Sequence, residues 1–156
     1  MRYTKIFSDS IDKEAVQGLI DSIHDKENVD LVFSTWGGEI STMKCLVNYL
    51  NTRGDVKITL IDEVSSAGTL LLTDFTGEIE LSPNLDFILF HAWDRESYSI
   101  RKGLINDNIL RQQTLEENKV HSKALKRIGL TDKECKQILK GKDVILYKKD
   151  FKRLKL

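Results

Sequence analysis

The segment VKITLIDEVSSAGTLLLTDFTGEIELSPNLDFILFH, residues 56–91, decides the fold that we expect for this chain. Its pattern predicts a strand, a sharp turn with two serines and a glycine, a buried helix, a short strand pair, and an apolar strand that ends at His91. Ser66 lies in the sharp turn, where the helix begins. The segment therefore presents a hydroxyl and an imidazole at strand ends, and these are the groups of a serine nucleophile and its general base.

The first part of the chain repeats the same alternation of strands and helices. Strands are expected before each of three amphipathic or apolar helices, at residues 3–7, 29–34 and 56–61. Strands joined by helices form parallel βαβ units, so the sequence predicts an α/β fold with a mostly parallel sheet. Gly37-Gly38, Ser65-Ser66 and His91 all follow strands, at the edge where sites form in such sheets.

Composition favours one soluble domain over residues 1–156. Lys+Arg and Asp+Glu are equal at 24 each, so no net charge attracts the chain to nucleic acid or to a membrane. No apolar run is long enough to span a bilayer, which predicts a cytoplasmic protein. Cys45 and Cys135 are far apart and lack metal-ligand spacing, so we expect neither a disulfide framework nor a metal, and no cofactor motif is present.

The chain changes character after His91. Residues 97–128 are rich in helix-forming residues and predict one long helix whose apolar residues need another subunit to cover them. Thr131 and Glu134 then form a capping box that starts a short helix, which Gly141 ends. A last apolar strand follows at residues 144–147, with Asp143 just ahead of it.

Each candidate residue also has a purely structural explanation. Ser66 is a suitable helix N-cap, and Gly37-Gly38 are suitable for a turn with positive φ. His91 suits a buried strand end, and Asp143 suits a turn before a strand. The chemical interpretation therefore depends on the fold bringing these residues together, with Asp143 as the acid that orients the histidine.

Taken together, these segments resemble the proteolytic subunit of the Clp protease, ClpP, in the ClpP/crotonase superfamily. The family's Ser-Pro-Gly-Gly loop matches Thr35-Trp36-Gly37-Gly38, and its Ala-Ala-Ser-Met-Gly nucleophile segment matches residues 64–68. Its Leu-Pro-Asn before an apolar strand that ends in histidine matches Ser82-Pro83-Asn84 and the strand to His91. The similarity runs from about residue 5 to residue 147, and its four motifs occur in the same order.

The resemblance implies a fold of repeated β-β-α units with a head, about residues 1–94 and 129–156, and a long projecting handle helix, about residues 97–128. It implies a serine endopeptidase in which Ser66 attacks a peptide carbonyl, His91 transfers the proton and Asp143 orients His91. The backbone N–H groups of Gly38 and Ala67 would form the oxyanion hole. The resemblance also implies a peptide or unfolded protein as the substrate, a homo-oligomer, with heptameric rings as the family's assembly, and an AAA+ unfoldase as a partner.

Several positions differ from the family and leave other interpretations open. Trp36 replaces the proline beside the glycine pair, Asp62 replaces a glycine, and Ser65 replaces an alanine, so two serines are adjacent. One alternative is a catalytically inactive or regulatory ClpP-fold assembly subunit. A crotonase-type protein, which binds a thioester through a similar pair of backbone N–H groups, is a third hypothesis.

Overall fold

The computed structural model of the chain describes residues 1–92 and 107–156. Its contacts divide the chain into two compact units. The first contains residues 1–90, 145–154 and 156, and the second contains residues 91–144 and 155. Head and handle as parts of one domain over residues 1–156 therefore stay a prediction, and each unit is described by itself.

Strand–helix repeats build the first unit. Its elements in order are β1 (Tyr3–Ser8), α1 (Lys13–Ile23), β2 (Val29–Thr35), α2 (Ile40–Asn51), β3 (Val56–Ser65), the short 3-10 turn η1 (Ser66–Thr69), α3 (Leu70–Asp74), β4 (Glu78–Phe90), β5 (Val144–Tyr147) and the 3-10 turn η2 (Lys148–Arg153). The sheet has the order β1-β2-β3-β4-β5. The first three strand pairs are parallel. The α/β fold with a mostly parallel sheet is thus confirmed.

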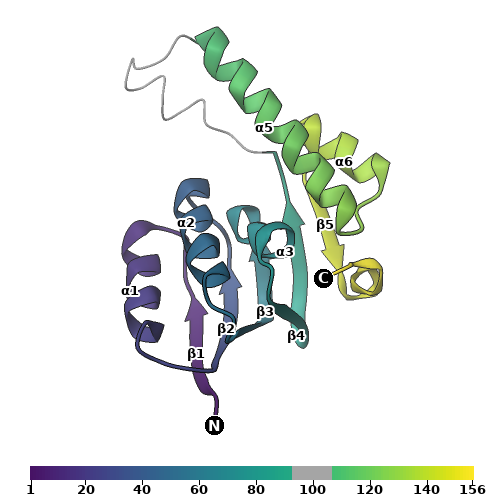
Figure 1. Cartoon of the computed structure of the whole chain (residues 1–156). Helices are drawn as coiled ribbons and strands as arrows, with labels where there is room; N and C mark the ends of the chain where they lie inside the picture. The colour runs from purple at the N-terminus through teal and green to yellow at the C-terminus, as the bar shows by residue number, and fades with distance from the viewer. Residues whose placement is uncertain (93–106) are drawn as a thin grey trace. The chain divides into compact units, whose positions relative to one another are not determined.

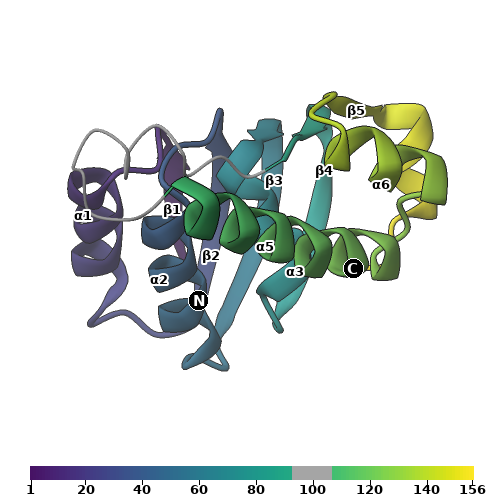
Figure 2. The same cartoon turned by 90° about the horizontal axis from the view of Figure 1, so that it is seen from above.

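Strands β1 to β4 lie in sequence order, and Figure 1 and Figure 2 show α1, α2 and α3 on one face of them. Right-handed crossovers in a single direction produce this one-sided arrangement. Alternate strand residues face the helices and are buried with residues of the helices, and the core includes Phe7, Leu31, Phe33, Ile58, Leu60, Val16, Leu19, Met43, Leu46 and Leu71. The other alternate residues, such as Ile6 with 64% of its surface exposed, face away from this core. The core thus fixes the strand ends that carry the candidate residues.

The short strand pair expected before His91 is instead part of one strand. β4 continues through residues 82–84, where the sequence suggested a break. The pairing with β3 shifts register between Leu60↔Leu81 and Glu63↔Phe87, and Asp62 adopts a φ of +53° at the irregularity. The extra residues lie on β4, which bulges between Leu81 and Phe87, and pairing then resumes and carries β4 to His91.

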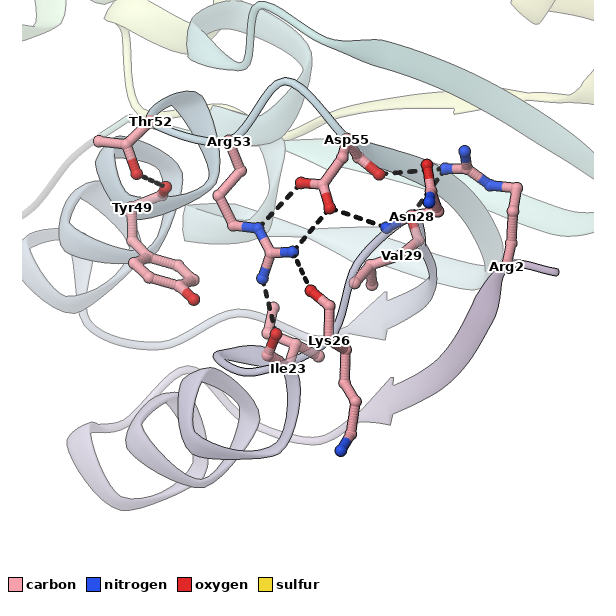
Figure 3. Close-up of polar contacts among 9 residues, drawn as sticks. All are labelled: Arg2, Ile23, Lys26, Asn28, Val29, Tyr49, Thr52, Arg53 and Asp55. Carbon is pink, nitrogen blue, oxygen red and sulfur yellow. Dashed lines mark hydrogen bonds and ion pairs between the residues drawn. The ribbon is translucent and has the colours of Figure 1, made fainter.

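A hydrogen-bonded cluster around Arg53 and Asp55 lies at the amino ends of β2 and β3, opposite the carboxyl ends that carry the candidate residues (Figure 3). Arg53, between α2 and β3, donates to the carbonyl oxygens of Ile23 at 2.6 Å and Lys26 at 2.5 Å, just after α1. It also donates to both oxygens of the Asp55 carboxylate, at 3.0 and 2.8 Å, and Asp55 accepts the Asn28 N–H at 2.8 Å. The cluster satisfies carbonyl groups that the end of a helix leaves unpaired.

Replacing Arg53 by methionine should lower the free energy of unfolding by about 2–3 kcal/mol, because several charge-assisted hydrogen bonds are lost from a largely buried group. Urea unfolding monitored by circular dichroism measures this change. Lys26→Met is the matched control, since the Lys26 ammonium is more exposed and pairs with Asp25 on the surface. We expect a change below about 1 kcal/mol there. Equal losses in the two variants would contradict the assigned role of the Arg53 cluster.

The same cluster predicts a pH dependence of stability. Hydrogen bonds from Arg53, the largest cause, lower the pKa of Asp55 from 3.8 to about 2. Because the folded pKa is the lower one, the cluster stabilises the fold above the unfolded pKa, and this contribution is lost as pH falls from about 4 toward 2. Urea midpoints measured between pH 2 and 5 should fall more steeply for the wild type than for Asp55→Asn. Parallel curves would contradict this prediction.

In the second unit, a helical hairpin joins α5 (Asp107–Arg127) to α6 (Asp132–Leu139). Gly129, with a φ of +117°, ends the first helix, and the predicted capping box of Thr131 and Glu134 starts the second. Of the predicted long helix, residues 107–127 are helical in the structure, and residues 97–106 lie outside the described residues. No helix in the described part of the chain is both long and apolar enough to cross a membrane.

Candidate active site

Ser66 occupies a strained turn directly after β3. It is the first residue of η1 and has a φ of +57°, in the left-handed region. Such a conformation costs a non-glycine residue about 1–3 kcal/mol, and strained strand-to-helix turns of this kind expose nucleophiles in other enzymes. Ser65 is different, because it is only 4% exposed and its hydroxyl donates to the Glu63 carboxylate at 3.5 Å. Of the two adjacent serines, Ser66 is the half-exposed one.

The glycine pair after β2 lies against this turn. Gly37 has a φ of +108° and Gly38 a φ of +149°, so both adopt a conformation that L side chains rarely take. A Cβ atom at Gly37 would lie 2.5 Å from the Ser66 Cβ and 3.0 Å from its Oγ. Only a glycine therefore lets the backbone after β2 come this close to the serine.

The loop between β1 and α1 holds the glycine pair from its other side. The Ile11 N–H donates to the Gly37 carbonyl and the Glu39 N–H donates to the Ile11 carbonyl, both at 2.8 Å. These bonds form a parallel bridge in which a Cβ atom at Gly38 would lie 2.3 Å from the Ile11 oxygen. The Gly37-Gly38 loop thus packs between the backbone of Ile11 and the turn that contains Ser66.

The backbone N–H groups of Gly38 and Ala67 are the expected donors of an oxyanion hole. The neighbouring Gly37 N–H already has a partner, because it donates to the Thr35 hydroxyl at 3.0 Å. The Gly38 N–H donates no hydrogen bond to any residue within 1–92 and 107–156. Ala67 is buried and is the second residue of η1, where a helix leaves its N–H groups without an internal acceptor. The two N–H groups expected to form an oxyanion hole are therefore those that local structure leaves available.

The other two candidate residues belong to the second unit. His91 directly follows β4 and is half-buried, and Asp143 directly precedes β5 and is exposed. Ser66 belongs to the first unit, so the assembly of Ser66, His91 and Asp143 into a triad stays a prediction. Within the residues that the structure describes, no three His, Cys, Asp or Glu side chains gather as they would around a metal ion.

The roles of two residues of this region were not predicted from the sequence. Ile11 and Thr35 both bind the glycine loop, Ile11 through its backbone and Thr35 through its side chain. Thr35 carried a weak signal, as the hydroxyl residue directly before the loop. Ile11 carried none, because any residue supplies the same backbone groups.

Two solved structures share this fold. A ClpP1 mutant from Listeria monocytogenes matches with a TM-score of 0.60 and 19% identity, over 96% of this chain and 85% of that one. The ClpP protease catalytic domain from Plasmodium falciparum matches with a TM-score of 0.63 and 15% identity, over 96% of this chain and 79% of that one. No protein-family model and no curated protein matches the sequence. The chain thus has a ClpP-like fold, as the resemblance in sequence predicts.

Proposed function

We propose that this chain is a ClpP-like serine endopeptidase that hydrolyses peptide bonds in peptides or unfolded proteins. The observation that carries the proposal is the close approach of the Gly37 backbone to Ser66, which occupies a strained and half-exposed turn. A helix N-cap needs neither that conformation nor that contact. Strain at a hydroxyl beside unused backbone N–H groups is instead typical of a nucleophile next to an oxyanion hole.

In the proposed mechanism, Ser66 Oγ attacks the scissile carbonyl carbon while His91 removes the hydroxyl proton. The oxyanion that forms accepts hydrogen bonds from the Gly38 and Ala67 N–H groups. His91 then gives its proton to the leaving amine, and the acyl group remains on Ser66 until water, activated by the same imidazole, releases it. Asp143 keeps His91 in the tautomer and orientation that these transfers need.

Hydrolysis of an unstructured fluorogenic peptide by the purified full chain tests this proposal. Ser66→Ala should abolish turnover, and Ser65→Ala is the matched control because its hydroxyl is buried and already bonded to Glu63. Turnover that survives in Ser66→Ala, or that is lost in Ser65→Ala alone, would overturn the assignment of the nucleophile.

One observation favours a second candidate, a ClpP-fold subunit that regulates or assembles with an active homologue. Asp143 is exposed, whereas the acid of a serine triad is normally buried. This candidate requires stable association with an active ClpP-type protein and no turnover by the isolated chain. Peptide cleavage by the purified chain, lost on Ser66→Ala, would exclude it.

We also propose that the protein acts in the cytoplasm as a homo-oligomer, with heptameric rings as its assembly and an AAA+ unfoldase as its partner. Helix α5 supports self-association, because Ile109 and Val120 lie three turns apart on one face and are 52% and 67% exposed. A different face of α5 contains Asn118, His121 and Leu125, which are buried. An apolar pair exposed away from the buried face is typical of a helix that needs a second partner.

Replacing Val120 by glutamate should therefore reduce the size of the assembly, because a charge at an apolar contact must be desolvated. Light scattering coupled to size-exclusion chromatography measures the mass. Gln112→Glu adds the same charge on the same helix at an exposed polar position about 80° around the helix from Val120, and it should leave the mass unchanged. An unchanged mass for Val120→Glu would show that this face of α5 is not the interface.

A further inference from the structure

Thr35, the last residue of β2, lies under the glycine loop and is 1% exposed. Its hydroxyl donates to the Asp9 carbonyl at 2.7 Å and accepts the Gly37 N–H at 3.0 Å. One hydroxyl thus joins the loop after β1 to the loop after β2. The bond from the Gly37 N–H is buried, so that N–H has no water as a substitute if the hydroxyl is removed, whereas the bond to the Asp9 carbonyl is partly buried.

The methyl group of Thr35 contacts the other side of the candidate site. A Cβ atom at Gly68, two residues after Ser66, would lie 2.4 Å from the Thr35 Cγ2. The methyl therefore occupies the space beside the turn of Ser66, while the hydroxyl holds the glycine loop. Serine supplies only the hydroxyl and valine supplies only the methyl groups, so threonine alone provides both contacts.

We propose that Thr35 is a positioning residue that holds the Gly37-Gly38 loop against the nucleophile Ser66. The Thr35 hydroxyl accepts a hydrogen bond from the Gly37 N–H, which fixes the peptide plane before Gly37. The Gly38 N–H then remains as the available donor of the loop. Thr35 touches no reacting atom and acts through the backbone of residues 37 and 38. This inference rests on the proposed function, and it assigns the geometry of the oxyanion hole to a side chain outside the triad.

The test compares three variants in steady-state peptide hydrolysis. Thr35→Val keeps the shape and loses the hydroxyl, and we expect it to lower kcat by about tenfold to a hundredfold with KM within about twofold, as small misplacements of catalytic groups do. Thr35→Ser restores the hydroxyl and should recover kcat to within about threefold of wild type. Ser34→Ala removes another buried hydroxyl, which donates to the Glu63 carbonyl at 3.2 Å rather than to the glycine loop, and should leave kcat unchanged.

A second measurement separates this inference from the proposed function. Amide hydrogen exchange at Gly37 should be slow in wild type, Thr35→Ser and Ser34→Ala, and faster in Thr35→Val. If wild type hydrolyses peptides and Thr35→Val keeps its kcat, the inference is wrong and the proposed function stands. If wild type is inactive, the proposed function fails. Equal exchange rates at the Gly37 amide in wild type and Thr35→Val would overturn the role of Thr35 in holding the loop, whether or not the protein is active.

Discussion

Replacing Gly37 by alanine should lower the rate of peptide hydrolysis at least about a hundredfold while the sheet stays folded. The added Cβ would lie 2.5 Å from the Ser66 Cβ and 3.0 Å from its Oγ. Because φ at Gly37 is +108°, the alanine also places its backbone in a region that favours glycine. The loop and the serine turn must then separate, which moves the Gly38 donor away from the nucleophile.

Gly18→Ala is the matched control for this substitution. Gly18 lies in α1, and a Cβ atom there meets nothing within 4 Å. It should keep full activity and raise the free energy of unfolding by about 0.5–1 kcal/mol, since alanine is favoured over glycine within helices. Hydrolysis rates and circular dichroism of both variants provide the comparison. Wild-type activity in Gly37→Ala would show that contact between this loop and Ser66 is irrelevant to the reaction.

Replacing His91 by alanine should lower kcat at least about a thousandfold, because the Ser66 hydroxyl is a weak nucleophile without a base. The residual rate should come from the backbone donors of Gly38 and Ala67, which this substitution leaves in place. Burst and steady-state kinetics with an activated ester separate acylation from deacylation, and both steps should slow because the same imidazole serves both.

His24→Ala is the matched control for His91→Ala. His24 is exposed at the end of α1 and should tolerate the change with unaltered kcat. A His91→Ala variant with wild-type kcat would assign the base to another group. Equal losses in the two variants would instead indicate a general effect on folding.

The placement of the glycine pair and Ser66 after strands was predictable from the sequence, because strand ends are local features. Alternating apolar residues define β2 and β3, and the glycine pair and Ser66 immediately follow those strands in the structure as expected. A parallel sheet then brings consecutive strand ends together. The contact between Gly37 and Ser66 therefore follows from topology once each strand is identified.

Features that depend on contacts between distant residues were not predictable. The sequence predicts a short strand pair and then a separate strand before His91, yet β4 is one strand because its pairing with β3 resumes beyond the bulge. His121 in α5 reads as a solvated residue among polar neighbours, but it is buried. The bond from the Thr35 hydroxyl to the Asp9 carbonyl joins the end of β2 to the loop after β1, and no local sequence pattern in either segment indicates it.

The central claim is that Ser66 is an activated nucleophile, and covalent labelling tests it most directly. The folded full chain is treated with a fluorophosphonate, and the modified residue is located by peptide mass spectrometry. The account predicts modification of Ser66 alone, with none in Ser66→Ala, unchanged labelling in Ser65→Ala and much slower labelling in His91→Ala. Folded protein that remains unmodified at every serine, or that is modified at a different serine, would contradict it.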